Sequence, residues 1–69
     1  MRKADVLRKM YPIGCTVELI SMDDKHAPPV GTIGKVFCVD DIGQIHVSWE
    51  NGSSLALIEG VDKWRKISQ

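Results

Sequence analysis

The segment 44–57 constrains the fold most, because it encodes two strands and the turn between them. Ile45, Val47 and Trp49 alternate with polar residues, so one face of the first strand is apolar and the other faces water. The pair Asn51-Gly52 follows, and both residue types tolerate the positive φ angles of a type I′ turn. The segment therefore predicts a β-hairpin whose apolar face belongs to a core.

The size of the chain limits what it can do. At 69 residues, 43% of them hydrophobic, it has the composition of one small globular domain with only a few kcal/mol of net stability. A deep active site is not expected, so the protein is predicted not to be an enzyme. No apolar run approaches the roughly 20 residues that span a bilayer, and no signal peptide is recognisable. We therefore expect a cytoplasmic protein without membrane contact.

The two cysteines fit this compartment. Cys15 and Cys38 fall on predicted strands, and no second cysteine or histidine stands at zinc-like spacing from either. The favoured interpretation is that both are reduced, small and buried, with a disulfide or metal role as the minor alternative. No cofactor is expected.

Short segments of helix and strand account for the remaining chain. Val6, Leu7 and Met10 share one face of a predicted helix in residues 4–10, which Pro12 ends, and all three are expected to dock on the β body. A strand is predicted at 15–20 with Cys15, Val17 and Leu19 inward, followed by an irregular loop 21–31. A second strand is predicted at 33–39, with a bulge or close backbone approach at Gly34, followed by a turn 40–43 in which Gly43 is left-handed. A connection 59–62 and a last strand 64–67 are predicted after the hairpin.

These segments predict the fold class. Five short strands separated by turn signals, with no linker, indicate one compact antiparallel barrel, mainly β, preceded by a short N-terminal helix. The helix occupies residues 1–10 and the barrel residues 11–69, within a single domain.

Charge is distributed unevenly although the net charge is zero. Residues 1–10 and residues 63–69 each carry +3, and the segment between them carries −6. The acidic body would repel a phosphate backbone, so only the two ends could bind nucleic acid, and only if they converge. The simpler interpretation is a set of solvated surface charges. The candidate nucleic-acid contacts are Arg2, Lys3, Arg8, Lys9, Lys63, Arg65 and Lys66.

Three blocks carry a resemblance to known families: residues 31–36, residues 40–47 and residues 49–53. They resemble a small SH3-like barrel. Over residues 11–67 the chain is similar to an uncharacterised family of short proteins, a domain of unknown function from conjugative elements and prophages of Gram-positive bacteria. More distantly it resembles the Mind-bomb/HERC type of barrel, which serves in protein recognition. The resemblance implies a five-stranded SH3-like barrel and an accessory role on a mobile element.

The resemblance also implies a place for a partner. Small barrels of this kind bind extended peptides between the loop after the first strand and the hairpin that carries the tryptophan, although Trp49 itself is more simply a core residue. An acidic, partly aromatic groove suits a basic or proline-containing peptide. The candidate groove consists of Met22, Asp23, Asp24, His26, Pro28, Pro29, Trp49, Glu50 and Asn51.

Catalytic and metal sites have little support in the sequence. His26 and His46 are the only histidines, and His46 is expected to face solvent. The pairs Asp23-Asp24 and Asp40-Asp41 are interpreted more simply as turn residues than as catalytic or metal-binding residues. No Ser/His/Asp set, phosphate loop or zinc signature is present. The first hypothesis is therefore a non-enzymatic module that binds a protein or peptide. Nucleic-acid binding is the alternative, and a small-molecule-binding oligomer is a second alternative; the oligomeric state stays open.

Overall fold

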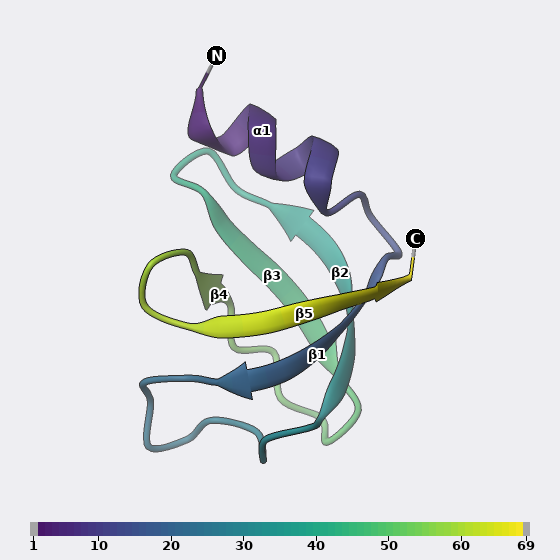
Figure 1. Ribbon diagram of the computed structural model, residues 1–69, viewed down its shortest axis with the longest axis vertical. Helices are drawn as coiled ribbons and strands as arrows, with labels where there is room; N and C mark the ends of the chain where they lie inside the picture. The colour runs from purple at the N-terminus through teal and green to yellow at the C-terminus, as the bar shows by residue number, and fades with distance from the viewer. Residues whose placement is uncertain (1, 69) are drawn as a thin grey trace.

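The computed structural model describes residues 2–68 as one short helix and five strands (Figure 1). α1, with 8 residues, has neither the length nor the apolar character of a membrane-spanning helix. The elements are α1 (Lys3–Met10), β1 (Thr16–Ser21), β2 (Ile33–Val39), β3 (Gln44–Trp49), β4 (Leu57–Ile58) and β5 (Lys63–Ser68).

The strands form one antiparallel sheet in the order β4-β3-β2-β1-β5. This confirms the prediction of a mainly β chain with five antiparallel strands and a short N-terminal helix. Within residues 2–68 the sheet does not close, because β4 and β5 are its outer strands and do not pair with each other. An isolated bridge between Glu59 and Asp62 lies in the connection between them. The predicted barrel is therefore an open, strongly curled sheet (Figure 1).

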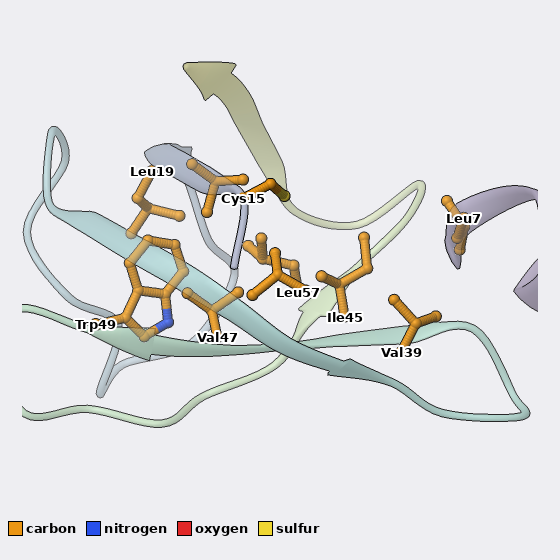
Figure 2. Close-up of a cluster of buried hydrophobic side chains, with 10 residues drawn as sticks. Leu7, Cys15, Leu19, Val39, Ile45, Val47, Trp49 and Leu57 are labelled. Atoms are coloured by element: carbon orange, nitrogen blue, oxygen red, sulfur yellow. The ribbon is translucent and has the colours of Figure 1, made fainter. Parts of the chain in front are cut away.

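The core contains the side chains that alternate along the strands. Cys15, Val17 and Leu19 point inward as predicted, and so do Ile45, Val47 and Trp49. Figure 2 shows Trp49 and Leu7 near opposite ends of the cluster. Its members are Leu7, Cys15, Val17, Leu19, Val36, Val39, Ile45, Val47, Trp49 and Leu57.

The helix docks through fewer side chains than predicted. Leu7 is buried against the core, and Ala4, one turn before it, is buried as well. Val6 and Met10 are 39% and 49% exposed, so the prediction is right for Leu7 and wrong for these two. α1 lies over one end of the sheet (Figure 1), and Ala4 and Leu7 are its buried residues.

A bulge in β2 changes which residues face outward. The register with β3 shifts between Val36 and Cys38, so Phe37 is an extra residue. The shift turns Cys38 outward, and the prediction that both cysteines are buried is wrong for Cys38. Gly34 makes the predicted close approach instead: a Cβ there would lie 2.8 Å from Trp49 Cε3 and 3.0 Å from the Ser48 carbonyl oxygen.

The turn after β3 differs from the predicted type I′ turn. Gly52 has φ +89°, but no other residue type has a positive φ within residues 2–68, so Asn51 does not adopt the required angle. Its side-chain oxygen instead accepts a hydrogen bond from the Ser53 N–H at 3.0 Å, while the Gly52 N–H donates to the Trp49 carbonyl. The result is a three-residue turn with Gly52 at the left-handed position.

Candidate interaction site

The first side of the predicted groove is the loop 21–31, which is held in place by packing and hydrogen bonds. Met22 packs against the core and Pro28 is buried. The Asp23 N–H donates to Asp62 Oδ1 at 3.1 Å, and Asp24 Oδ1 accepts from the His26 N–H at 2.7 Å. Asp24 is therefore a turn residue, as the simpler interpretation held. Of the six loop residues, Asp23, Asp24, His26 and Pro29 are exposed.

The second side of the groove lies elsewhere. Trp49 is 3% exposed, and its indole N–H donates to the Leu55 carbonyl at 2.9 Å, so it is a core residue. Glu50 and Asn51 are exposed, and the Glu50 N–H bonds to the carbonyl of Ile33. Trp49 and Glu50 help to line a hollow of about 320 Å³ together with Ile33, Gly34, Lys35 and Ser48. None of the six predicted loop residues lines it, so the structure does not bring the nine residues together.

The sequence did not single out Asp62, which organises this region. Its side chain is 7% exposed, and its Oδ2 accepts from the Ile58 N–H at 2.9 Å while Oδ1 accepts from Asp23. The carboxylate thus holds the start of the loop against the turn between β4 and β5. One aspartate in a Gly-Val-Asp connection carries no pattern that distinguishes it from a surface residue.

The two basic ends of the chain do converge. The Lys66 ammonium donates to the Met10 carbonyl at 2.8 Å, which places β5 beside the end of α1 (Figure 1). Most of the positive charge is nevertheless compensated. Ion pairs join Arg2 to Asp5 (3.5 Å), Lys3 to Glu59 (3.5 Å), Arg8 to Asp5 (3.2 Å) and Asp41 (2.8 Å), and Arg65 to Glu18 (2.6 Å).

Arg8 pairs with two carboxylates, Asp5 and Asp41. The hydrogen bond that Arg8 donates to Asp41 raises the pKa of Arg8, and the same bond lowers the pKa of the Asp41 carboxyl. Among the seven candidate nucleic-acid contacts, Lys9, Lys63 and Lys66 form no ion pair with residues 2–68, although the Lys66 ammonium donates to the Met10 carbonyl. Phosphate binding depends on uncompensated cations, so this pairing weakens the nucleic-acid alternative.

The predicted turn at 40–43 is confirmed and includes a histidine contact. Asp40 Oδ1 accepts from the backbone of Ile42 and Gln44, and Oδ2 lies 2.8 Å from His46 Nε2. His46 is half-buried rather than fully solvent-facing. The hydrogen bond from His46, followed by that from Gln44, lowers the pKa of Asp40. No group of three or more potential metal ligands converges here or elsewhere in residues 2–68.

An apolar hollow of about 420 Å³ lies between the chain that links α1 to β1 and the end of β2. Ile13 is 79% exposed and Phe37 is 50% exposed, and both line it. Large exposed side chains around one concavity mark interaction sites more often than scattered ones do. The lining residues are Arg8, Tyr11, Pro12, Ile13, Phe37, Cys38 and Val39, and we call this set the Ile13–Phe37 hollow.

The Ile13–Phe37 hollow arises because β2 extends farther than β1. The Gly14 N–H donates to the Val36 carbonyl at 2.7 Å, and the chain before Gly14 turns away from β2. Beyond Val36, the side of β2 toward β1 has no backbone partner within residues 2–68. Only Arg8 reaches it, donating Nε–H to the Val39 carbonyl at 3.1 Å.

A third concavity, of about 360 Å³, lies on the side of Trp64. Tyr11 meets Trp64 edge to face, with ring centroids 5.7 Å apart. The Trp64 indole N–H is buried and has no acceptor among residues 2–68. Since the N–H is covered rather than open to the concavity, it does not define a ligand contact.

A comparison with family models adds one finding. The model described as "Domain of unknown function (DUF4314)" matches residues 2–67. No curated protein and no solved structure matches the chain.

Proposed function

The chain belongs to the DUF4314 family of domains of unknown function, and from this premise we propose that it is a non-enzymatic interaction module that binds a protein or peptide. The Ile13–Phe37 hollow carries the proposal. Its apolar lining is open to solvent at Ile13 and Phe37, although the same chain buries its other aromatic side chains at least in part. Burial of such side chains by a partner is the usual source of binding energy in an interface.

The biological setting is a separate part of the proposal. The resemblance to short proteins of Gram-positive conjugative elements and prophages favours a cytoplasmic accessory protein of a mobile element. The strand order, with β1 between β2 and β5, is compatible with an opened SH3-like barrel. Both statements rest on the resemblance and on fold analogy.

The exposed residues of the loop 21–31 form a second candidate surface for the same partner class. Asp23, Asp24, His26 and Pro29 are exposed there. Asp23 and Asp24 form no ion pair within residues 2–68, so the loop offers acidic side chains that suit a basic segment.

Site-specific photo-crosslinking separates these surfaces. Benzoylphenylalanine replaces Ile13 in one variant, His26 in a second and Val61 in a third, and each variant is expressed in its host. Val61 is the control because it is 53% exposed and lies in neither surface. We expect a crosslinked protein from position 13 that is absent from position 61. A product from position 26 alone would assign the partner to the loop 21–31 instead.

Binding by purified components completes the test. The crosslinked protein is identified, purified and titrated calorimetrically against wild type, Ile13→Ser and Val61→Ser. We expect Ile13→Ser to weaken binding on the order of tenfold and Val61→Ser to leave it unchanged. The proposal fails if no position yields a product, or if both substitutions behave as wild type.

A further inference from the structure

We propose that Asn51 is a site of spontaneous covalent modification, at which its side-chain amide reacts with the backbone nitrogen of Gly52 and is converted to a carboxylate. The reaction involves neither of the candidate partner surfaces. It occurs at the Asn51-Gly52 pair, where the structure forms a turn other than the predicted type I′ turn.

The turn after β3 leaves both reacting residues open. Asn51 is the only asparagine of the chain, and a glycine follows it. Glycine has no side chain that would hinder the approach of its own nitrogen to the Asn51 amide. Asn51 and Gly52 are exposed, and a Cβ built on Gly52 would meet no atom beyond its chain neighbours within 4 Å. Water therefore also reaches the turn.

The reaction needs no reactant besides water. The Gly52 nitrogen loses its proton to solvent and bonds to Asn51 Cγ, and the Cγ–Nδ2 bond breaks as ammonia leaves with a proton from solvent. The product is a succinimide ring. Addition of water at Cγ opens the ring to aspartate, and addition at the Asn51 backbone carbonyl opens it to isoaspartate, in which the main chain runs through Cβ and Cγ. In sum, one amide and one water become one carboxylate and one ammonium ion.

The Ser53 N–H favours the first step. It donates to Asn51 Oδ1 at 3.0 Å and thereby holds the side-chain amide against the turn. Negative charge develops on Oδ1 as the Gly52 nitrogen adds to Cγ. A donor already placed at this oxygen stabilises the charge, as the donors of an oxyanion hole do. The turn therefore presents the Asn51 amide in an activated position.

A second hydrogen bond restrains the same step. The Gly52 N–H donates to the Trp49 carbonyl at 3.0 Å, so the attacking nitrogen is occupied in the folded turn. A single hydrogen bond contributes little net free energy, and exposed turns open locally far more often than the core does. The reaction therefore proceeds from the opened turn, and we expect it to be about tenfold slower in the folded protein than in the unfolded chain.

The two products differ in their effect on the hairpin. Aspartate keeps an oxygen that accepts from the Ser53 N–H, so the turn is retained with one added charge. Isoaspartate lengthens the main chain by one carbon, inside the turn that the Trp49 N–H closes by donating to the Ser53 carbonyl at 3.0 Å. The lengthened turn does not match this spacing. Isoaspartate therefore loosens the end of β3 at Trp49, a core residue.

Mass spectrometry of aged protein tests the site. Folded wild type and wild type in guanidinium chloride are incubated in mildly alkaline buffer, and the fragment that contains residue 51 is followed over time. We expect a mass gain of about 1 Da at residue 51, methylation of the product by an isoaspartate methyltransferase, and about tenfold faster conversion of the unfolded chain. Absence of conversion in the folded protein would overturn the site, and equal rates would overturn the restraint by the Trp49 carbonyl.

Asn51→Gln is the matched control. It keeps an exposed amide at residue 51, but the Gly52 nitrogen can then close only a larger ring that forms much more slowly. We expect no product at residue 51 of this variant in the time that converts wild type. Conversion at the wild-type rate would contradict attack by the Gly52 nitrogen.

Urea unfolding of the separated products tests the consequence for the hairpin. Asn51→Asp is the reference, because it has the charge of the products and an ordinary main chain. We expect Asn51→Asp to keep the wild-type urea midpoint and the isoaspartyl form to unfold at a lower urea concentration. Equal midpoints for these two forms would overturn the proposed loosening of the turn.

Discussion

Asp62 connects three segments of the chain through one carboxylate. It lies between β4 and β5, accepts one hydrogen bond from Ile58 and another from Asp23, and is 7% exposed. Both donors are part-buried backbone N–H groups. A single side chain therefore sets the starting position of the loop 21–31.

Removal of the Asp62 carboxylate should lower the stability of the protein. We expect Asp62→Ala to lower the free energy of unfolding by about 2–4 kcal/mol, because two part-buried N–H groups lose a charged acceptor. Asp62→Asn keeps one acceptor oxygen and should lose about half as much. Asp23→Ala is the control, since Asp23 contributes only its backbone N–H to this contact. Urea unfolding measures all three, and equal losses for Asp62→Ala and Asp23→Ala would contradict the assignment.

For single residues, the sequence predicts well which strand side chains face the core, but it does not predict where the alternation is interrupted. The two-residue alternation correctly places Val17 and Val47 in the core, because strand geometry alone decides the side on which they lie. It fails at Cys38, because the bulge at Phe37 shifts the phase by one residue. The bulge belongs to the pairing of β2 with β3, which no local pattern encodes.

α1 is attached to the sheet mainly through Leu7. We expect Leu7→Ala to lower the free energy of unfolding by about 2–4 kcal/mol, since Leu7 is 1% exposed within the core cluster. Met10→Ala, on the same helix and 49% exposed, should cost less than about 1 kcal/mol. Urea unfolding of the two variants provides the comparison. Similar losses would mean that Met10 docks as the sequence predicted.

The turn between β2 and β3 should make stability depend on pH. An unfolded aspartate has a pKa near 3.9, and the bonds from His46 and Gln44 lower the pKa of Asp40 in the folded state. The folded state thus gains stability above the unfolded pKa and loses it as pH falls through the folded pKa. We expect the urea midpoints of wild type and Asp40→Asn to differ near pH 6 and to converge near pH 2.

An exposed aspartate serves as the control for this titration. Asp24→Asn makes the same charge change in the loop 21–31. Its urea midpoint should follow that of the wild type across the pH range. A gap between wild type and Asp40→Asn that stays constant from about pH 6 to pH 2 would refute the linkage.

Most elements and the turn 40–43 were predictable, whereas the turn after β3 and the docking of α1 were not. Alternation and turn residues predicted β2 and β3 with little error, because each strand carries its own signal. The type I′ turn was wrong because the Asn51 side chain bonds to Ser53 and keeps Asn51 out of the left-handed region. The predicted docking of Val6 and Met10 was wrong because helical periodicity does not specify how far the neighbouring sheet extends.

Across the whole molecule, charge is balanced by pairs that are distant in sequence. Arg65 bonds to Glu18 across 47 residues, and Arg8 bonds to Asp41 across 33. We expect wild-type protein to bind a duplex of about 20 base pairs with Kd weaker than about 100 μM near 0.15 M salt. Fluorescence anisotropy measures this binding. Tight, steeply salt-dependent binding by wild type would restore the nucleic-acid alternative.

Removal of carboxylates paired with the arginines tests whether ion pairing is the reason for weak nucleic-acid binding. Glu18→Gln combined with Asp41→Asn frees Arg65 and removes one of the two carboxylates paired with Arg8, while changing no basic residue. This double variant should bind the same duplex more tightly than wild type, with a steeper dependence on salt. An unchanged affinity would mean that ion pairing is not what limits phosphate binding.

The candidate site could not be predicted from the sequence, because it too is formed by segments that are distant along the chain. The Ile13–Phe37 hollow combines the linker after α1 with the end of β2, and neither segment has a motif. Ile13 reads as part of a turn between Pro12 and Gly14, and Phe37 as one more hydrophobic residue of a strand. Only the different lengths of β1 and β2 expose them together.

The pairing of β1 with β5 has a consequence during synthesis. β1 lies between β2 and β5 in the sheet, but β5 follows it by more than 40 residues along the chain. At a translation rate of about 5–20 residues per second, β1 has one backbone edge without its neighbour for roughly 2–8 seconds. During this interval that edge is open to pairing with other extended segments. The period of greatest exposure to misassembly therefore precedes the native state.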